Sequence, residues 1–185
     1  MKTALQRQCE TYHQVNSVIG NCGAVLFGST DLAQLPVAEL LHCFGLNMSV
    51  SNRSMEGLTV REAPDYLEDC VIALHPNKVF LCFGDVEMQE GTSAENEFFA
   101  NYQLLIESIQ KRCGGSVYLL PPMAASDPFR DELRKLADRT NCTYVENRSH
   151  VSTDRPMLHL FSTLTRHIRN TKINLGDAMG MTLHS

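Results

Sequence analysis

Short apolar runs alternate with longer segments of helical periodicity along this chain, and the alternation is repeated five times. The runs are rich in β-branched and aromatic residues, as strands are, and they lie at residues 23–27, 48–50, 78–83, 116–120 and 142–146. Parallel strands need a crossover connection of a dozen or more residues, which is usually a helix. The pattern therefore predicts a three-layer α/β/α sandwich, in which helices cover both faces of a doubly wound, five-stranded parallel sheet.

The segments between the runs repeat apolar residues at helical spacing, as Leu160, Leu164 and Ile168 do. The Asp127-Pro128 pair suits a helix start, with an N-cap followed by proline in the first turn. We therefore expect helices over residues 3–18, 33–44, 59–74, 94–112, 127–140 and 156–169.

Length and composition bound the class of protein. The 185 residues, 43% of them hydrophobic, suffice for one buried core, so we expect a single domain over residues 1–170 and a C-terminal tail over residues 171–185. A net charge of −5 leaves no basic surface for a phosphate backbone, which argues against a nucleic-acid partner. The seven cysteines form no CxxC pair, so we expect reduced thiols, no metal and no other cofactor.

The apolar runs are far shorter than the roughly 20 residues that cross a bilayer, which predicts no membrane-spanning helix. The N-terminal residues become polar within a few positions and carry no apolar signal-peptide core. We therefore expect a cytoplasmic protein that does not bind membranes. The sequence leaves open whether it forms a homo-oligomer.

In doubly wound sheets the loops at the carboxyl ends of the strands build the ligand site. Here these loops are residues 28–32, 51–57, 84–91, 121–126 and 147–154. Their polar residues and glycines fall in four stretches, which are Gly28-Ser29-Thr30-Asp31, Asn52-Arg53-Ser54-Met55-Glu56-Gly57, Gly84-Asp85-Val86-Glu87 and Asn147-Arg148-Ser149-His150.

These stretches resemble the sequence blocks of the SGNH hydrolases, also called the GDSL family, and in particular the platelet-activating-factor-acetylhydrolase-like branch. Members are esterases and acylhydrolases of flavodoxin-like fold, with the blocks Gly-Asp-Ser-(Leu/Ile), Asn-Arg-Gly-Ile-x-Gly, Gly-x-Asn-Asp and Asp-x-x-His. The likeness covers roughly residues 10–169 and extends to Pro36, HPNKVFL and NYQLLIESI. It implies the SGNH hydrolase fold and a cleft for a small ester or acylated ligand.

The resemblance assigns roles at the first two blocks. Gly28 matches the family's glycine, Ser29 stands where the family has aspartate, and Thr30 stands where it has the nucleophilic serine. Asn52 is shared, and Gly57 matches the glycine whose backbone N–H helps to form the oxyanion hole. A threonine nucleophile carries an extra methyl group, which restricts χ1 in the tight turn.

The later blocks depart further from the family. Gly84 matches, but Val86 replaces the asparagine that donates to the oxyanion, and Glu87 falls on the adjacent aspartate. His150 matches the base, while Asn147 replaces its acidic partner. Loss of one side-chain oxyanion donor costs about 10²–10³ in kcat, and an Asp-to-Asn change in a serine-protease triad costs about 10⁴. The resemblance therefore implies a hydrolase lineage with a degraded catalytic set, a pseudoenzyme.

An altered esterase is one reading of these residues. In it Thr30 is the nucleophile, His150 is the base, Asn147 orients the imidazole, and the N–H groups of Thr30 and Gly57 bind the oxyanion. Nearby polar groups offer substitutes, namely Ser29 as nucleophile, Asp31 or Glu87 as orienting acid, and His159 as base.

A non-catalytic binding or scaffold protein is the second reading, because Val86 makes the oxyanion hole less polar and suits a small acylated or sugar ligand. The carboxylates of Asp31, Asp85 and Glu87 leave a third reading, a cation site with oxygen ligands. Acids at these positions also suit helix N-caps and first turns.

Overall fold

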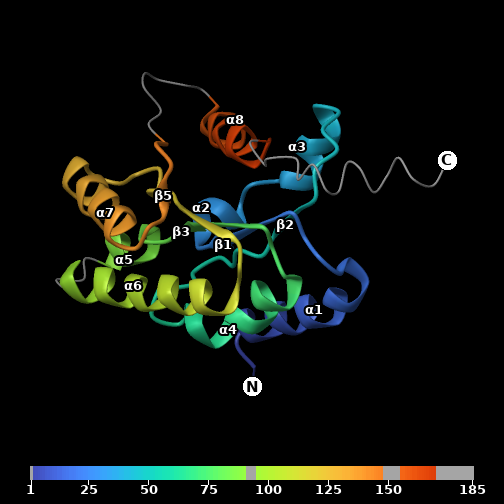
Figure 1. The fold of residues 1–185 in the computed structure, drawn as a ribbon, viewed down its shortest axis with the longest axis horizontal. Coiled ribbons are helices and arrows are strands. Elements are labelled where there is room, and N and C mark those ends of the chain that lie inside the picture. Colours follow the sequence, from blue (N-terminus) through green and yellow to red (C-terminus); the bar gives the residue numbers. More distant parts are fainter. Residues whose placement is uncertain (1, 91–94, 148–154, 170–185) are drawn as a thin grey trace.

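The structure, a computed structural model, describes residues 2–90, 95–147 and 155–169 of the chain. It confirms the predicted three-layer α/β/α sandwich (Figure 1). All pairings in the five-stranded sheet are parallel, and the strand order is β2-β1-β3-β4-β5. The strands are β1 (Ala24–Gly28), β2 (Val50–Asn52), β3 (Lys78–Cys82), β4 (Ser116–Leu119) and β5 (Thr143–Tyr144).

Helices cover both faces of this sheet, as a doubly wound topology requires (Figure 1). One face packs against α1 (Ala4–Ile19), α4 (Ala63–Cys70), the 3₁₀ turn η1 (Ile72–Leu74), α6 (Glu95–Arg112) and α7 (Asp127–Arg139). The other face packs against α2 (Thr30–Ala33), α3 (Val37–Cys43) and α8 (Pro156–Arg169).

The central strands are buried on both faces, which explains why they read as continuous apolar runs. In β1, Val25 and Phe27 point into the core on the α6 side, and Ala24 and Leu26 point into the core on the α8 side. Successive side chains of a strand alternate between faces, so one short run supplies both cores.

Two segments that were expected to be single helices differ in the structure. The expected helix over residues 33–44 is helical mainly as α3, which begins after Pro36, a residue with no N–H to continue a helix, while α2 ends at Ala33. Residues 59–74 contain a turn, α4 and the 3₁₀ turn η1. An additional helix, α5 (Asp85–Glu90), occupies most of the expected loop 84–91.

The N-terminus of α7 differs by one residue from the expected cap. Ser126, not Asp127, is the N-cap, because its side chain accepts a hydrogen bond from the backbone N–H of Phe129 at 3.3 Å. Asp127 instead lies in the first turn, where its charge suits the helix dipole.

Within the described residues, every helix is too short or too polar to cross a membrane. The seven cysteines are all unpaired. The expected tail, residues 171–185, lies outside the described residues, so the division of the chain at residue 170 stays a prediction.

Candidate active site

The turn after β1 is held tightly against β3. A Cβ on Gly28 would lie 2.2 Å from the carbonyl oxygen of Cys82, so only glycine fits there. The backbone N–H of Ser29 donates to the same carbonyl at 3.0 Å. This close approach fixes the start of α2, whose first residue is Thr30.

The loop after β2 brings Gly57 to Thr30. The backbone N–H of Gly57 donates a hydrogen bond to Thr30 Oγ1 at 3.3 Å. Gly57 has a φ of 77°, and Thr30 is half-buried. The Thr30 hydroxyl and the Gly57 N–H, for which the resemblance implies the roles of nucleophile and oxyanion donor, therefore lie side by side.

Asn52 organises the two loops that meet there. Its amide nitrogen donates to the carbonyl oxygens of Leu32 and Leu35 at 2.7 and 3.3 Å, and its amide oxygen accepts from the N–H of Ser54 at 3.1 Å. Both the nitrogen and the oxygen of the Asn52 amide therefore have hydrogen-bond partners within the protein. Asn52 thus positions the loop that carries Gly57.

The third strand end contributes a glycine and a hydrocarbon side chain. Gly84 has a φ of 117°, and a Cβ there would lie 2.7 Å from Cζ of Phe129, which packs against it. Val86 is half-buried in the first turn of α5 and has no polar hydrogen to donate.

The acidic residues of the site connect its loops to one another. Asp85 Oδ2 accepts from the N–H of Asp31 at 3.1 Å, and Asp31 Oδ2 accepts from the N–H of Met123 at 2.7 Å. Glu87 Oε1 accepts from the N–H of Val60 at 2.7 Å. All three acids lie in first helical turns, of α2 or α5. One oxygen of each carboxylate thus already accepts a hydrogen bond from a backbone N–H.

Burial raises the pKa of Asp31 above that of an ordinary carboxyl group. The N–H of Met123 opposes this rise, and the nearby charge of Asp85 adds to it. The third reading, a cation site, finds no geometric support among the described residues, where no group of three or more His, Cys, Asp or Glu side chains is arranged to hold a metal ion.

Ser29 is fully buried, and its hydroxyl oxygen has no hydrogen-bond partner among the described residues. In this arrangement the side chain is shielded from an ester that approaches Thr30. Ser29 therefore lies beneath the candidate site, where an ester does not reach its hydroxyl.

The last block is described only in part. Asn147 follows β5 and is buried, and its carbonyl oxygen accepts from Nη1 of Arg130 at 3.4 Å. His150 lies outside the described residues. His159 lies half-buried on α8, at a position set by that helix.

Arg130 is a residue of the site that sequence reasoning missed. Its guanidinium is buried and donates to five acceptors at 3.1–3.5 Å, which are the carbonyl oxygens of Pro122, Met123, Ala125 and Asn147 and the carboxylate of Glu146. It thereby links the loop after β4 to the end of β5. The sequence indicated that Arg130 is buried, because it precedes Leu133 and Ala137 by three and seven residues on the apolar face of α7.

No family model matches the chain. The chain is 31% identical over 80 residues to Protein LYK2 of Arabidopsis thaliana, a match that takes in 41% of this chain. The chain spans only 12% of the length of that curated relative.

Solved structures resemble the chain over most of its length. A Streptococcus pneumoniae protein named for platelet activating factor superposes with a TM-score of 0.74 at 14% identity, and the match covers 89% of this chain and 92% of that one. Axe2, an acetylxylan esterase from Geobacillus stearothermophilus, gives 0.60 at 18% identity, with 81% and 95% covered. A GDSL-like lipase from Parabacteroides merdae gives 0.59 at 15% identity, with 80% and 97% covered. At these identities the likeness shows the fold alone, which is that of the SGNH hydrolases.

Proposed function

We propose that this chain, which has the SGNH hydrolase fold, descends from enzymes that act on carboxylic or acetyl esters and retains their cleft with a degraded catalytic set. It binds a small ester or acylated ligand at Thr30 and Gly57 and turns it over slowly or not at all.

The hydrogen bond between Gly57 and Thr30 carries this proposal. An ester whose carbonyl carbon meets Thr30 Oγ1 would place its carbonyl oxygen near the N–H of Gly57, since the two groups are 3.3 Å apart. That juxtaposition is what acyl transfer requires of a nucleophile and an oxyanion donor.

Three features argue for slow turnover. Val86 has an apolar side chain where the family has an asparagine, and loss of one side-chain oxyanion donor costs about 10²–10³ in kcat. The methyl group of Thr30 limits the rotation of its hydroxyl. The carboxylate of Asp31, one substitute for the missing acid, already accepts the N–H of Met123.

Hydrolysis of p-nitrophenyl acetate by the purified protein tests the proposal, with Thr30→Ala as the matched variant. We expect the wild-type and Thr30→Ala rates to agree within a few-fold. A wild-type rate more than about 100-fold above that of Thr30→Ala would contradict the degraded set and assign Thr30 as a working nucleophile. His150→Ala, measured beside it, shows whether the imidazole shares that role.

The binding role has its own test, because the half-buried Val86 supplies an apolar contact for an acyl group. Thermal-shift measurements with acetylated sugars and short esters are expected to show stabilisation. Gly57→Asn is the blocking variant, since asparagine tolerates positive φ and a Cβ at Gly57 meets no atom within 4 Å. Stabilisation that survives in Gly57→Asn, or none in the wild type, would count against binding at this cleft.

A further inference from the structure

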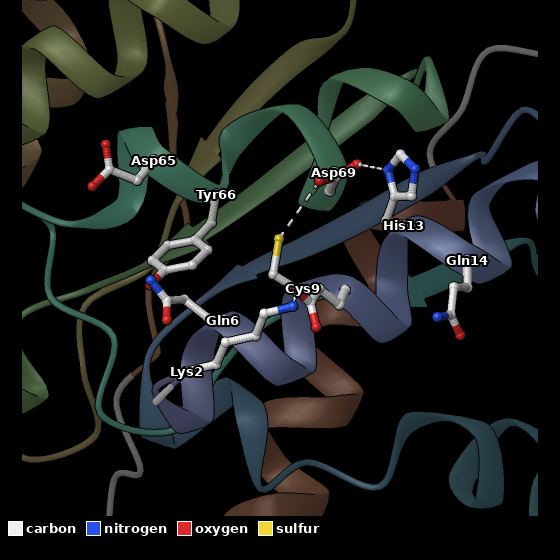
Figure 2. Close-up of a pocket in the computed structure, with 9 residues that line it drawn as sticks. Lys2, Gln6, Cys9, His13, Gln14, Asp65, Tyr66 and Asp69 are labelled. Atoms are coloured by element: carbon white, nitrogen blue, oxygen red, sulfur yellow. Dashed lines mark hydrogen bonds and ion pairs between the residues drawn. The ribbon is translucent and has the colours of Figure 1, made fainter.

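The groove between α1 and α4 is polar, and several of its side chains pair with one another (Figure 2). Asp69 Oδ1 lies 2.7 Å from His13 Nδ1, and Asp69 Oδ2 accepts a hydrogen bond from the thiol of Cys9 at 3.7 Å (Figure 2). Lys2 and Glu10, which also line this groove, form an ion pair. These side chains therefore bind one another, whereas a groove on the opposite face of the sheet is apolar.

The apolar groove, of about 260 Å³, lies between α8 and the residues just after α3. Phe44 and Leu46 line it on the α3 side, and Leu158 and Phe161 line it from α8. The rings of Phe44 and Phe161 stack with their centroids 5.9 Å apart. Phe161 is buried, but Phe44 is 58% exposed. An aromatic ring thus faces solvent beside the groove, and a segment that covered it would remove apolar surface from water.

The chain leaves α8 at this apolar groove. Arg169, the last residue of α8, lines the groove, and residues 170–185 follow it in the sequence. Phe161 lies eight residues before Arg169, which is about 12 Å back along the helix. Ile173 and Leu175 lie four and six residues after Arg169, and an extended chain spans up to about 13 and 20 Å over these lengths. The segment after Arg169 is therefore long enough to return to the groove.

The end of α8 is held in place by a buried lysine. Lys78, the first residue of β3, is buried, and its Nζ donates to the carbonyl oxygens of His167 and Ile168 at 2.6 and 3.2 Å. Carbonyl groups in the last turn of a helix have no partner within that helix, so the lysine satisfies two of them. The point at which the chain leaves α8 is therefore fixed relative to the sheet.

Apolar and polar residues alternate in the segment after α8. Ile173 and Leu175 flank Asn174, and a second alternating run follows over residues 179–183. Successive side chains of an extended segment point to opposite sides, so Ile173 and Leu175 would share one side. Asp177 falls on the same side, so the apolar surface of the first run is limited to Ile173 and Leu175.

We propose that residues 173–175 dock onto the apolar groove as an extended segment, with Ile173 and Leu175 covering Phe44 and Phe161. The occupant is this chain's own segment because only residues 170–172 separate it from the groove lining. A short tether gives a segment an effective concentration of roughly millimolar order. A second copy of the chain or a free peptide at lower concentration therefore competes poorly with it.

The proposal is independent of the proposed function, because the lining of the apolar groove includes neither Thr30 nor Gly57. Failure of ester binding at those two residues leaves the docking unaffected, and failure of the docking leaves ester binding unaffected.

The test places the photo-crosslinking residue p-benzoylphenylalanine at position 44 of the whole 185-residue chain and maps the linked peptides by mass spectrometry. We expect a link between residue 44 and residues 170–185 at the mass of the monomer. The same probe in place of Leu104, which is 63% exposed on α6 on the other face of the sheet, is the matched control and is expected to give no link to this segment. Links from residue 44 only to α8, or to a second copy at twice the monomer mass, would overturn the proposal, as would the absence of any link.

Two variants of the probe-carrying protein separate docking from the mere nearness of a tethered segment. Leu175→Asp and Asn174→Asp each introduce an aspartate, at adjacent positions of the same tether. We expect Leu175→Asp to lower the yield of the link about tenfold, because burial of a leucine side chain shifts a docking equilibrium by at least that order. Asn174→Asp, with its side chain directed away from the groove, is expected to stay within about twofold of the parent yield. An equal loss in both variants, or no loss in Leu175→Asp, would overturn the proposal.

Discussion

The side chain of Thr30 accepts a hydrogen bond from the backbone N–H of Gly57 at 3.3 Å. These residues come from loops after two neighbouring strands, β1 and β2, and they are 27 positions apart in the chain. A hydroxyl and an N–H meet at the edge of the sheet where a doubly wound fold builds its site. This contact is the geometry on which the proposed ester-binding role depends.

Under the proposed function, Thr30→Ser/Val86→Asn is expected to raise ester hydrolysis, because asparagine supplies a side-chain donor where the resemblance expects the oxyanion amide. We expect kcat/KM for p-nitrophenyl acetate to increase by about 10² in Thr30→Ser/Val86→Asn relative to wild type. Thr30→Ala/Val86→Asn is the matched control and should show no such gain. An equal gain in both double variants would mean that the amide acts without the residue-30 hydroxyl.

The fold was predictable from the sequence because it depends on local signals. Buried parallel strands read as short apolar runs, and their crossover helices repeat apolar residues at helical spacing. Caps and helix starts are more subtle: the α7 cap lies one residue earlier than Asp127-Pro128 suggested, and the helix expected from residue 33 begins only after Pro36. Element types therefore followed from periodicity, whereas boundaries depended on individual hydrogen bonds.

The site was predictable only where the backbone dictates the residue. Gly28 and Gly84 are required by close contacts with Cys82 and Phe129, and such requirements survive when the chemistry changes. Arg130 was missed because its helical spacing indicates only a buried position, whereas its role depends on carbonyl oxygens that the fold brings near. The pairing of His150 with an acid stays a prediction, since that residue lies outside the described ranges.

Gly84→Ala is expected to destabilise the protein by about 3 kcal/mol, which combines positive-φ strain with the contact between the new methyl group and Phe129. Gly57→Ala is the matched control. It has a similar backbone strain but open space around the Cβ, so we expect a loss of about 1 kcal/mol. Urea denaturation of both variants measures the difference. Equal losses would show that packing against Phe129 contributes nothing.

Arg130→Lys is expected to lower the free energy of unfolding by about 3 kcal/mol, because an ammonium group cannot reach the spread of carbonyl oxygens that the guanidinium bonds. Arg134→Lys serves as the control on the same helix. Its side chain is 42% exposed, against 6% for Arg130, and we expect a loss of about 0.5 kcal/mol. Denaturant titration of the two variants checks this. A similar small loss in both would show that Arg130 does not hold the loops together.

Asp31→Asn is expected to flatten the pH dependence of stability. Burial raises the pKa of Asp31, so between the ordinary carboxyl pKa and this raised value the folded protein binds a proton that the unfolded chain has released. Across this window the contribution of Asp31 to the free energy of unfolding of the wild type falls as the pH rises.

The asparagine variant carries no charge, and its amide oxygen can still accept from the N–H of Met123. Its stability relative to the wild type should therefore rise through the window and stay constant above it. Urea denaturation from about pH 3 to about pH 8 measures this difference. Asp138→Asn, at an exposed position of α7, is the control for a lost surface charge. A difference between Asp31→Asn and the wild type that shrinks with rising pH would mean that the fold favours the ionised form of Asp31.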